Sequence, residues 1–359
     1  MVEKKLKICF RVEAGNITGT GHLMEIVTLI KSLRKRIKFF AIAIVNDYAL
    51  CTEKLQSIVD KIEIVPDEFR GDAELDYMIP LLRKEGVTVF VADILNRTTL
   101  YYDRLNKEID KTFLIFDNDD HREIPATVVV NFSITQSPDF YEKASSFNTE
   151  YLIGPKYALL DEDLCCKWSG VFKLRGEVKK IFVNQGGSDP FGMTAKILTV
   201  LLKLKLKQEI IIVIGGAITT NHMNELEVLK PLLKGNYKLY ENITQQMMYE
   251  LISESDIALT AAGNTLYELA FFGIPSIVIG HHGKHDRIAS KFHEQGAVVN
   301  LGIGTRIDEN EISQTIKLLL CDKGKRRELS IYARQIVDGY GTGRLADMMK
   351  TRIRTGCTN

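Results

Sequence analysis

Short runs of β-branched residues, each followed by a stretch with helical periodicity, recur along the whole sequence. This alternation is typical of βα units, in which a helix carries the chain from one parallel strand to the next. The run VTVFVADI, at residues 87–94, is apolar at nearly every position, as expected for a strand buried between two helix layers. The pattern therefore predicts an α/β protein built on parallel sheets.

A break in this rhythm divides the chain of 359 residues, which is long for a single core. The first half contains these expected strands: Leu6–Val12, Phe39–Val45, Ile62–Val65, Val87–Ala92, Phe113–Phe116 and Val128–Val130. Residues 161–180 carry charges without a clear period. The second half then contains these expected strands: Lys180–Val183, Ile210–Ile214, Tyr237–Tyr240, Ile257–Leu259, Ser276–Ile279 and Val298–Asn300.

We therefore predict two doubly wound, Rossmann-like domains, at residues 1–163 and 177–359, joined by a linker at Leu164–Gly176. Two or three helices between Glu309 and about Arg352 are assigned to the second domain. Ligands of such sheets bind at the carboxyl ends of the strands. We expect those ends to face each other across a cleft, and we look for the chemistry in the loops that follow strands.

Composition narrows the class of protein. Lys and Arg total 47 and Asp and Glu total 46, without a long basic run, so nucleic acid is not an expected partner. No stretch of 18 apolar residues predicts a membrane span, and the N-terminal residues do not form a signal-peptide pattern, so we expect a cytoplasmic protein. The six cysteines form no CxxC pair, and neither a zinc cage nor a disulfide framework is expected.

The first candidate loop is FRVEAGNITGTGHLM, which follows the first strand. Gly19 and Gly21 would let the backbone approach a ligand, and a helix is predicted to begin near His22. A helix N-terminus disfavours an imidazolium, so His22 would keep a neutral nitrogen that can accept a proton as a general base. The alternative is that His22 only caps or packs against the helix.

A dinucleotide fingerprint is a further alternative for this loop. Gly19 and Gly21 follow a strand, and Asp47 follows the next strand. The third position of the fingerprint is Met24, where helix–strand packing requires Gly or Ala. We therefore expect no NAD, and no other cofactor is indicated.

The second loop is NQGGSDPFGMT. Gly186 and Gly187 follow a strand directly, and Ser188 and Asp189 precede a helix. The backbone N–H groups and the hydroxyl of such a turn can bind a phosphate or a sugar. An ordinary turn in which Asp189 caps the helix explains the motif equally well.

The third loop, TAAGNTLYELAFFGIPSIVIG, is the most specific. Small residues up to Gly263 allow close approach, and Asn264 and Thr265 open a helix whose N-terminus can hold a diphosphate. Glu268 lies one turn further on the same side, where a carboxylate can accept hydrogen bonds from both ribose hydroxyls. The alternative is an ordinary capped helix.

The fourth loop, GHHGKHDR, contains His281, His282, His285 and Asp286. These residue types can bind a metal, but no Cys or Glu partner follows at a ligand spacing. We expect a polar lining that includes His285 as a ligand contact, and no metal site.

These loops, in this order, resemble those of the UDP-sugar hydrolases of the pseudaminic-acid pathway and of the related SpsG-like spore-coat polysaccharide proteins. These families are similar to the MurG-type glycosyltransferases, so the resemblance implies the GT-B fold. It also implies that His22 activates water, that the segment 262–265 contacts the diphosphate and that Glu268 holds the ribose. Arg11, in the same FRVEAGN segment as the first loop, is assigned to the binding site.

The sequence departs from the family at three places. Glu25 stands where the family has Arg, Asp93-Ile94-Leu95 replaces Asp-x-Tyr, and Lys284-His285 replaces an Asn-Gln pair. The sugar is therefore left open. We predict hydrolysis of a UDP-sugar; a glycosyltransferase or hydrolysing 2-epimerase on the same scaffold, or a weakly catalytic UDP-sugar binding protein, are the alternatives.

Overall fold

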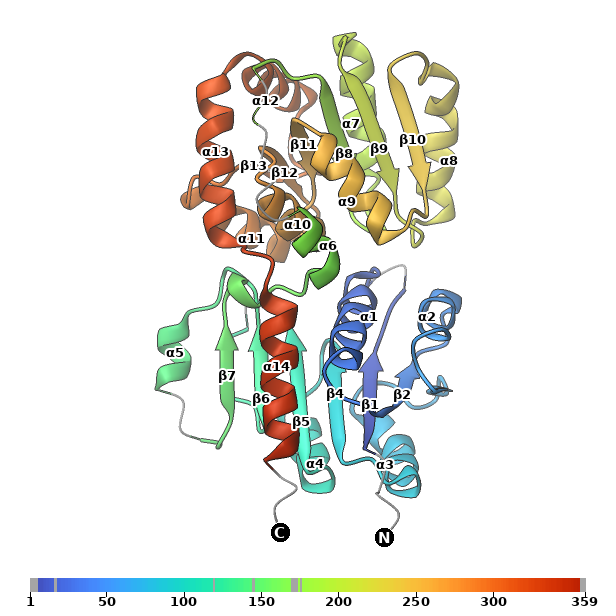
Figure 1. Ribbon diagram of the computed structural model, residues 1–359. Helices are drawn as coiled ribbons and strands as arrows, with labels where there is room; N and C mark the ends of the chain where they lie inside the picture. The colour runs from blue at the N-terminus through green and yellow to red at the C-terminus, as the bar shows by residue number, and fades with distance from the viewer. Residues whose placement is uncertain are drawn as a thin grey trace. The chain divides into compact units, whose positions relative to one another are not determined.

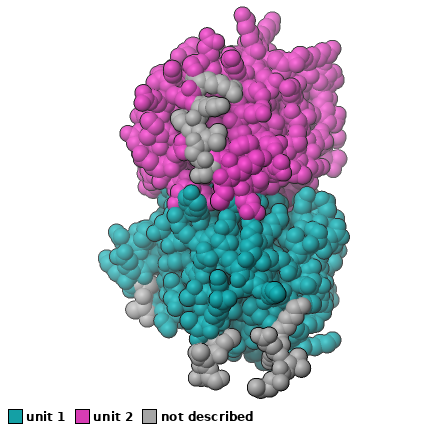
Figure 2. All heavy atoms as spheres, in the orientation of Figure 1, with its two compact units in different colours: residues 1–14, 21–162, 340–359 teal, residues 15–20, 163–339 magenta. Residues whose placement is uncertain are grey.

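The computed structural model describes residues 6–15, 18–118, 120–143, 146–168, 174 and 176–355. The chain forms two compact units, which Figure 2 shows in different colours. Unit 1 comprises Met1–Ala14, Gly21–Glu162 and Tyr340–Asn359, and unit 2 comprises Gly15–Thr20 and Asp163–Gly339.

Unit 1 contains a seven-stranded sheet in which all neighbouring strands are parallel (Figure 1). The strand order is β3-β2-β1-β4-β5-β6-β7. The direction in which strands are added therefore reverses between β1 and β4, which is the switch point of the sheet. The strands are β1 (Lys7–Val12), β2 (Phe40–Val45), β3 (Lys61–Ile64), β4 (Val89–Asp93), β5 (Lys111–Phe116), β6 (Val128–Asn131) and β7 (Glu150–Ile153).

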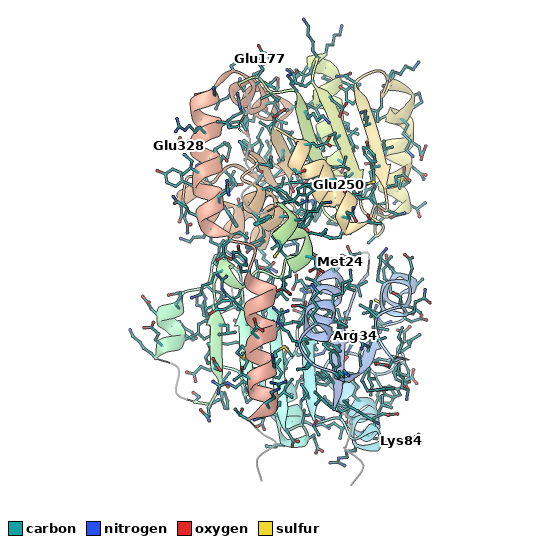
Figure 3. All side chains as sticks on the ribbon, viewed as in Figure 1. Met24, Arg34, Lys84, Glu177, Glu250 and Glu328 are labelled. Atoms are coloured by element: carbon teal, nitrogen blue, oxygen red, sulfur yellow. The ribbon has the colours of Figure 1, made fainter. Side chains whose placement is uncertain are left out.

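Helices cover this sheet with their apolar faces. In α1 the buried residues include Leu23, Ile26, Ile30 and Leu33, which recur at the spacing of one helix face. The helices of unit 1 are α1 (Gly21–Arg34), α2 (Ala49–Leu55), η1 (Gly71–Ala73), α3 (Glu74–Glu85), α4 (Thr99–Glu108), α5 (Pro138–Glu142), η2 (Pro155–Tyr157) and α14 (Gly341–Arg354). In Figure 3, the labels Met24 and Arg34 mark the first and last turns of α1.

The last helix, α14, corrects the predicted domain boundary. The sequence analysis assigned it to the second domain, but it belongs to unit 1, where it packs against α1. The hydroxyl of Thr342 donates to the carbonyl of Leu160 at 2.6 Å, and a Cβ added at Gly341 would lie 2.3 Å from the carbonyl oxygen of Ala158. Helical periodicity shows that a face is apolar, but it does not show which sheet that face covers.

Unit 2 contains a six-stranded parallel sheet in the order β10-β9-β8-β11-β12-β13. Its switch point lies between β8 and β11. The strands are β8 (Lys180–Asn184), β9 (Glu209–Ile214), β10 (Tyr237–Glu241), β11 (Ile257–Thr260), β12 (Ser276–Gly280) and β13 (Val298–Ile303). All the strands predicted from the sequence are present, and the short strand β7 of unit 1 was missed.

The helices of unit 2 pack around an aliphatic core that contains Ile181, Ile210, Ile257 and Ile277. They are α7 (Met193–Leu204), α8 (Thr220–Leu229), η3 (Lys230–Leu232), α9 (Gln245–Glu254), α10 (Asn264–Phe272), α11 (Gly283–Glu294), α12 (Glu309–Cys321) and α13 (Lys323–Ile336). The helix α6 (Glu162–Trp168) crosses the boundary of the units and contains the start of the predicted linker. Residues 169–173 and 175 of that linker lie outside the described residues.

None of the helices formed by the described residues is both long enough and apolar enough to cross a membrane.

Because α14 packs in unit 1, a substitution in its buried face should destabilise unit 1 and not unit 2. Leu345 is fully buried, so Leu345→Ala should lower the free energy of unfolding by about 2–5 kcal/mol. Amide hydrogen exchange should accelerate in β1 and α1 of unit 1 and stay unchanged in unit 2. Thr351→Ala, at an exposed position of α14, is the matched control. Faster exchange confined to unit 2 would contradict the assignment of α14.

Candidate functional site

His22 lies at the switch point of the unit 1 sheet. The strand β1 leads into the loop that precedes α1, and β4, the neighbour of β1 across the switch, ends at Asp93. The helix α1 begins at Gly21, so His22 occupies its first turn, as the sequence predicted. Two elements far apart in the sequence therefore bring His22 and Asp93 together at the carboxyl edge of one sheet.

The imidazole of His22 is held by a carboxylate. Its Nδ1 lies 2.6 Å from Oδ1 of Asp93, and the side chains are 12% and 1% exposed. Because a carboxylate accepts the bond, Nδ1 carries the proton and Nε2 keeps its lone pair when the ring is neutral. Asp93 also stabilises the imidazolium that forms when Nε2 takes up a proton, so this charge opposes the effect of the helix dipole.

Glu25 completes what we call the His22 cluster: His22, Glu25 and Asp93. One ligand atom from each of these side chains lies within 4.8 Å of the other two. Burial raises the pKa of the Glu25 carboxyl well above its usual value, and the negative charge of Asp93 raises it further. Such a set can hold a proton between carboxyl groups or coordinate a cation.

The loop before α1 is fixed where it leaves the sheet. The side chain of Asn46 accepts from the backbone N–H of Ala14 at 3.1 Å and donates to its carbonyl at 2.8 Å. Gly15 and Gly19 then pair through two backbone hydrogen bonds, and Gly19 has a left-handed φ of 74°. This is a narrow turn in which the left-handed φ of Gly19 favours glycine, and the predicted approach of a ligand to its backbone stays a prediction. Residues 16 and 17 at its tip lie outside the described residues.

Arg11 does not have the ligand-binding position that the sequence analysis assigned to it. Its side chain is 1% exposed, and its Nη2 contacts Glu74 at 2.7 Å and Glu13 at 2.6 Å. Arg97 contacts the same two carboxylates, at 2.9 and 2.6 Å. With its donors used inside the fold, Arg11 supports the end of β1 instead of contacting a ligand.

At the switch point of unit 2, Asn184 joins the loops that follow β8 and β11. Its Nδ2 donates to the carbonyl of Val213 at 2.9 Å, and its Oδ1 accepts from the N–H of Gly186 at 3.0 Å. The same oxygen accepts from the hydroxyl of Thr265 at 3.1 Å. Thr265, predicted as a ligand contact, thus uses its hydroxyl to fix the two loops relative to each other.

The glycine turn after β8 is closely packed against Thr20 and Gly215. A Cβ added at Gly187 would lie 2.4 Å from Oγ1 of Thr20, and one at Gly215 would lie 2.4 Å from Cα of Gly187. In the described part of the chain, no atom beyond the two neighbouring residues lies within 4 Å of a Cβ added at Gly186. Gly187 is therefore required for packing, and the open side of the turn is at Gly186. Ser188 follows it and is 7% exposed.

Asp189 is a helix cap, which was the alternative interpretation. Its two carboxylate oxygens accept from the N–H groups of Met193 and Thr194, both at 2.8 Å, at the start of α7. Asp189 is 4% exposed and has a left-handed φ of 37°. Both of its oxygens hold the start of α7, so the capping interpretation explains the position of this carboxylate, and the ligand contact stays a prediction.

The helix α10 presents polar residues along one side. Asn264, Thr265 and Glu268 are partly exposed, whereas Leu266 and Tyr267 are buried. Gly263 is its N-cap, and among the described residues no atom beyond its chain neighbours lies within 4 Å of a Cβ added there, so the described residues leave the helix N-terminus open. The carboxylate Oε1 of Glu268 accepts a hydrogen bond from the side chain of Gln245, in the first turn of α9.

The histidines after β12 form a stacked group. The rings of His281 and His285 are 5.1 Å apart, and those of His282 and His285 are 4.3 Å apart. Burial lowers the pKa of His281 to about 4 and that of His285 well below its usual value. His281 contacts Gln185 at 3.3 Å. The lowered pKa values favour neutral imidazoles at pH 7.

Three residues that organise these loops were given no role from the sequence: Asp93, Asn184 and Gln245. Asp93 and Asn184 share a recognisable signal, since each is a polar residue that directly follows an apolar run and ends a strand at a switch point. Gln245 carries no such signal, because its partner Glu268 is identified only once α9 and α10 are folded together.

One curated protein matches the chain almost from end to end. SpsG of Bacillus subtilis (strain 168), a spore coat polysaccharide biosynthesis protein, is 22% identical over 343 residues. The match covers 94% of this chain and 96% of SpsG. It confirms the resemblance to the SpsG-like proteins that the loop motifs predicted. No protein-family model matches the chain.

Solved structures confirm the GT-B fold with its two Rossmann-like sheets. The UDP-GlcNAc 2-epimerase of Neisseria meningitidis, bound to UDP-GlcNAc, has a TM-score of 0.69 at 12% identity and covers 96% of this chain and 99% of its own. MurG of Acinetobacter baumannii has a TM-score of 0.64 at 14% identity, with the same coverage of 96% and 99%.

The network around Arg11 predicts a pH-dependent stability. Burial acts to raise the pKa of the Glu74 carboxyl, but Arg11 and Arg97 outweigh it and hold that pKa below its usual value. Glu74 therefore contributes stability that is complete above the unfolded-state pKa of about 4.3 and is lost as the pH falls through the lower folded-state value. Glu74→Gln should lower the free energy of unfolding at pH 7 by about 3–5 kcal/mol.

Urea unfolding at a series of pH values measures this effect. Glu85→Gln is the matched control, because Glu85 pairs with Lys7 and Lys61 nearer the surface and should cost about 1 kcal/mol or less. Equal losses for the two variants would show that the buried network does not hold the fold.

Proposed function

We propose that this GT-B protein, similar to SpsG over nearly its whole length, is an enzyme that hydrolyses a UDP-activated acetamido sugar at its anomeric C–O bond. The observation that carries the proposal is the contact of 2.6 Å between Nδ1 of His22 and Asp93. It fixes the tautomer in which Nε2 can accept a proton, and it stabilises the imidazolium that results. His22 is the general base of the proposal, and Asp93 is its positioning residue.

The proposal assigns the UDP group to unit 2. The diphosphate is held at the open N-terminus of α10, by the backbone at Gly263 and Asn264, where the helix dipole favours an anion. The carboxylate of Glu268, oriented by Gln245, accepts hydrogen bonds from the ribose hydroxyls. Gly186 and Ser188, at the adjoining loop after β8, contribute further backbone and hydroxyl donors.

The chemical step balances as a hydrolysis. Nε2 of His22 takes a proton from water while the water oxygen forms a bond to the anomeric carbon. The bond from that carbon to the β-phosphate oxygen breaks, and its electron pair leaves with UDP. The N-terminus of α10 stabilises the charge that develops on the leaving diphosphate. The products are UDP and the free sugar.

The sugar is bound by neutral groups in this proposal. His285 is uncharged at pH 7, so it recognises a hydroxyl or an acetamido group by hydrogen bonding rather than by charge. SpsG is a spore coat polysaccharide biosynthesis protein, which supports a role for the product in the biosynthesis of a surface polysaccharide. The resemblance of the loops to the hydrolases of the pseudaminic-acid pathway supports a nonulosonic acid as the alternative.

A hydrolysing 2-epimerase or a glycosyltransferase is the second candidate, favoured by the fold similarity to UDP-GlcNAc 2-epimerase and to MurG. The groups proposed to bind UDP are the same for both candidates. The candidates differ in which group reacts with the anomeric carbon of the sugar. The sugar released distinguishes the epimerase by its configuration at C2, and a requirement for an acceptor distinguishes the transferase.

We predict that the protein releases UDP and free sugar from a UDP-N-acetylated sugar without an acceptor. His22→Ala should lower kcat by about 10²–10⁴-fold, because the general base is lost. An NMR time course of the anomeric and UDP signals, over a panel of UDP-N-acetylated sugars, measures both products.

The matched control is His293→Ala, which removes an exposed histidine from the last turn of α11 and should leave the rate unchanged. Release of UDP only when an acceptor is present would replace the hydrolase by a transferase. Binding of UDP-sugar without turnover in the wild type would identify a binding protein.

A separate prediction concerns the nucleotide. Glu268→Gln should weaken UDP binding by about 10- to 100-fold, because a charged acceptor for two hydroxyls is replaced by a neutral one. Isothermal titration calorimetry with UDP measures this directly, without turnover. Glu328→Gln, at the position on α13 labelled in Figure 3, is the control. Unchanged affinity in Glu268→Gln would remove Glu268 from the nucleotide site.

A further inference from the structure

The His22 cluster contains one carboxyl group more than a histidine–aspartate pair needs. His22 and Glu25 are three residues apart on α1, so both lie on the side of the helix that covers the end of β4. Glu25 is 2% exposed and Asp93 is 1% exposed. The proposed function uses His22 and Asp93 and leaves the role of Glu25 unexplained.

A carboxylate oxygen of Glu25 lies within 4.8 Å of one of Asp93, and both side chains are buried. Two ionised carboxylates offer acceptors only and repel each other in a buried site, so this arrangement favours a proton on one of them. Asp93 is in contact with the imidazole, which favours its ionised form, so the proton belongs to Glu25. Burial, the proximity of the two carboxyl groups and the contact with His22 therefore favour a proton on Glu25 and a negative charge on Asp93.

The surrounding charges act in the same direction. Besides Asp93 on β4, the charged groups that act most strongly on Glu25 are His22 on α1 and Asp117, which follows β5. Asp117 is 7% exposed and, like Asp93, opposes ionisation of Glu25. Of these three groups, only His22 can carry a positive charge, and Asp93 lies against it.

We propose that Glu25 is a positioning residue that keeps a proton in its hydrogen bond to Asp93, so that a single negative charge faces the imidazole of His22. The inference rests on the proposed role of His22 as general base. It gives the site a chain of three groups, in which Glu25 donates to Asp93 and Asp93 accepts from Nδ1 of His22.

This chain has two physical consequences. It fixes the orientation of the Asp93 carboxylate, and through it the ring plane of His22. It also limits the basicity of His22, because a second buried carboxylate would stabilise the imidazolium so strongly that the ring would be protonated before it met water. Gln at position 25 preserves the donor without a charge, whereas Ala removes the donor.

The test compares the wild type with Glu25→Gln and Glu25→Ala in the full chain. The titration midpoint of the His22 imidazole is followed by NMR in protein labelled with ¹⁵N-histidine and assigned with His22→Gln. This readout needs no substrate, so it remains valid if the protein does not hydrolyse UDP-sugars. The pH profile of kcat/KM and the metal content of the purified protein are measured in parallel.

We expect Glu25→Gln to keep both the midpoint and the pH profile of the wild type. Glu25→Ala should lose about 10- to 100-fold in kcat/KM, as when other buried partners that orient a functional histidine are removed. Rescue by Gln but not by Ala separates positioning from simple packing. If Glu25→Ala fails to fold, the midpoint in Glu25→Gln still decides the proposal.

Two outcomes would overturn the inference. A fall of about one pH unit or more in the His22 midpoint of Glu25→Gln would show that Glu25 is ionised in the wild type. A stoichiometric divalent metal in the wild type that is lost in Glu25→Gln would show that the cluster holds a cation in place of the proton.

Discussion

Each parallel sheet has one place where the direction of strand addition reverses, and the residues proposed to act lie beside these two places. In unit 1 the reversal separates β1 from β4, so the chain leaves the sheet in opposite directions and opens space above the ends of both strands. His22 enters that space from α1, and Asp93 ends the strand beneath it. In unit 2 the same reversal separates the glycine turn after β8 from the start of α10. Strand order therefore determines which loops can cooperate.

The sequence predicted the parts of this arrangement that depend on local pattern. Apolar runs separated by helical segments located the strands. The spacing of Leu23, Ile26 and Ile30 located α1, because a helix buried on one face has apolar residues at regular intervals. Strand β7 left no such trace, since it is short and only Ile153 among its residues is buried. The helix α14 left a clear trace but was assigned to the wrong unit, because periodicity carries no information about the partner surface.

Contacts between side chains that are far apart in the sequence could not be predicted from local pattern. His22 and Asp93 are 71 residues apart, and their contact follows from the β1–β4 neighbourhood. For Asp189 the local pattern was ambiguous. A carboxylate before a helix has the same sequence pattern whether it binds a ligand or caps the helix. Its two bonds of 2.8 Å to α7 decide for the cap. Arg11 likewise needed the structure, because only folding brings the carboxylates of Glu13 and Glu74 to its donors.

The two candidate sites differ in the ionisable groups that surround them. This difference fits the chemistry proposed for each unit. Around His22 the nearby groups are acidic and buried, so the cluster is suited to accepting and holding protons. In unit 2 the imidazoles of His281 and His285 are neutral at pH 7, because burial makes their cationic forms unfavourable. In the proposal they contribute no positive charge, and the attraction of an anion is assigned to the N-terminus of α10, whose backbone dipoles are fixed by the fold and do not titrate. A diphosphate bound there would feel the same field across the whole pH range in which His22 changes its protonation. Binding of the leaving group and activation of water can thus respond to pH independently.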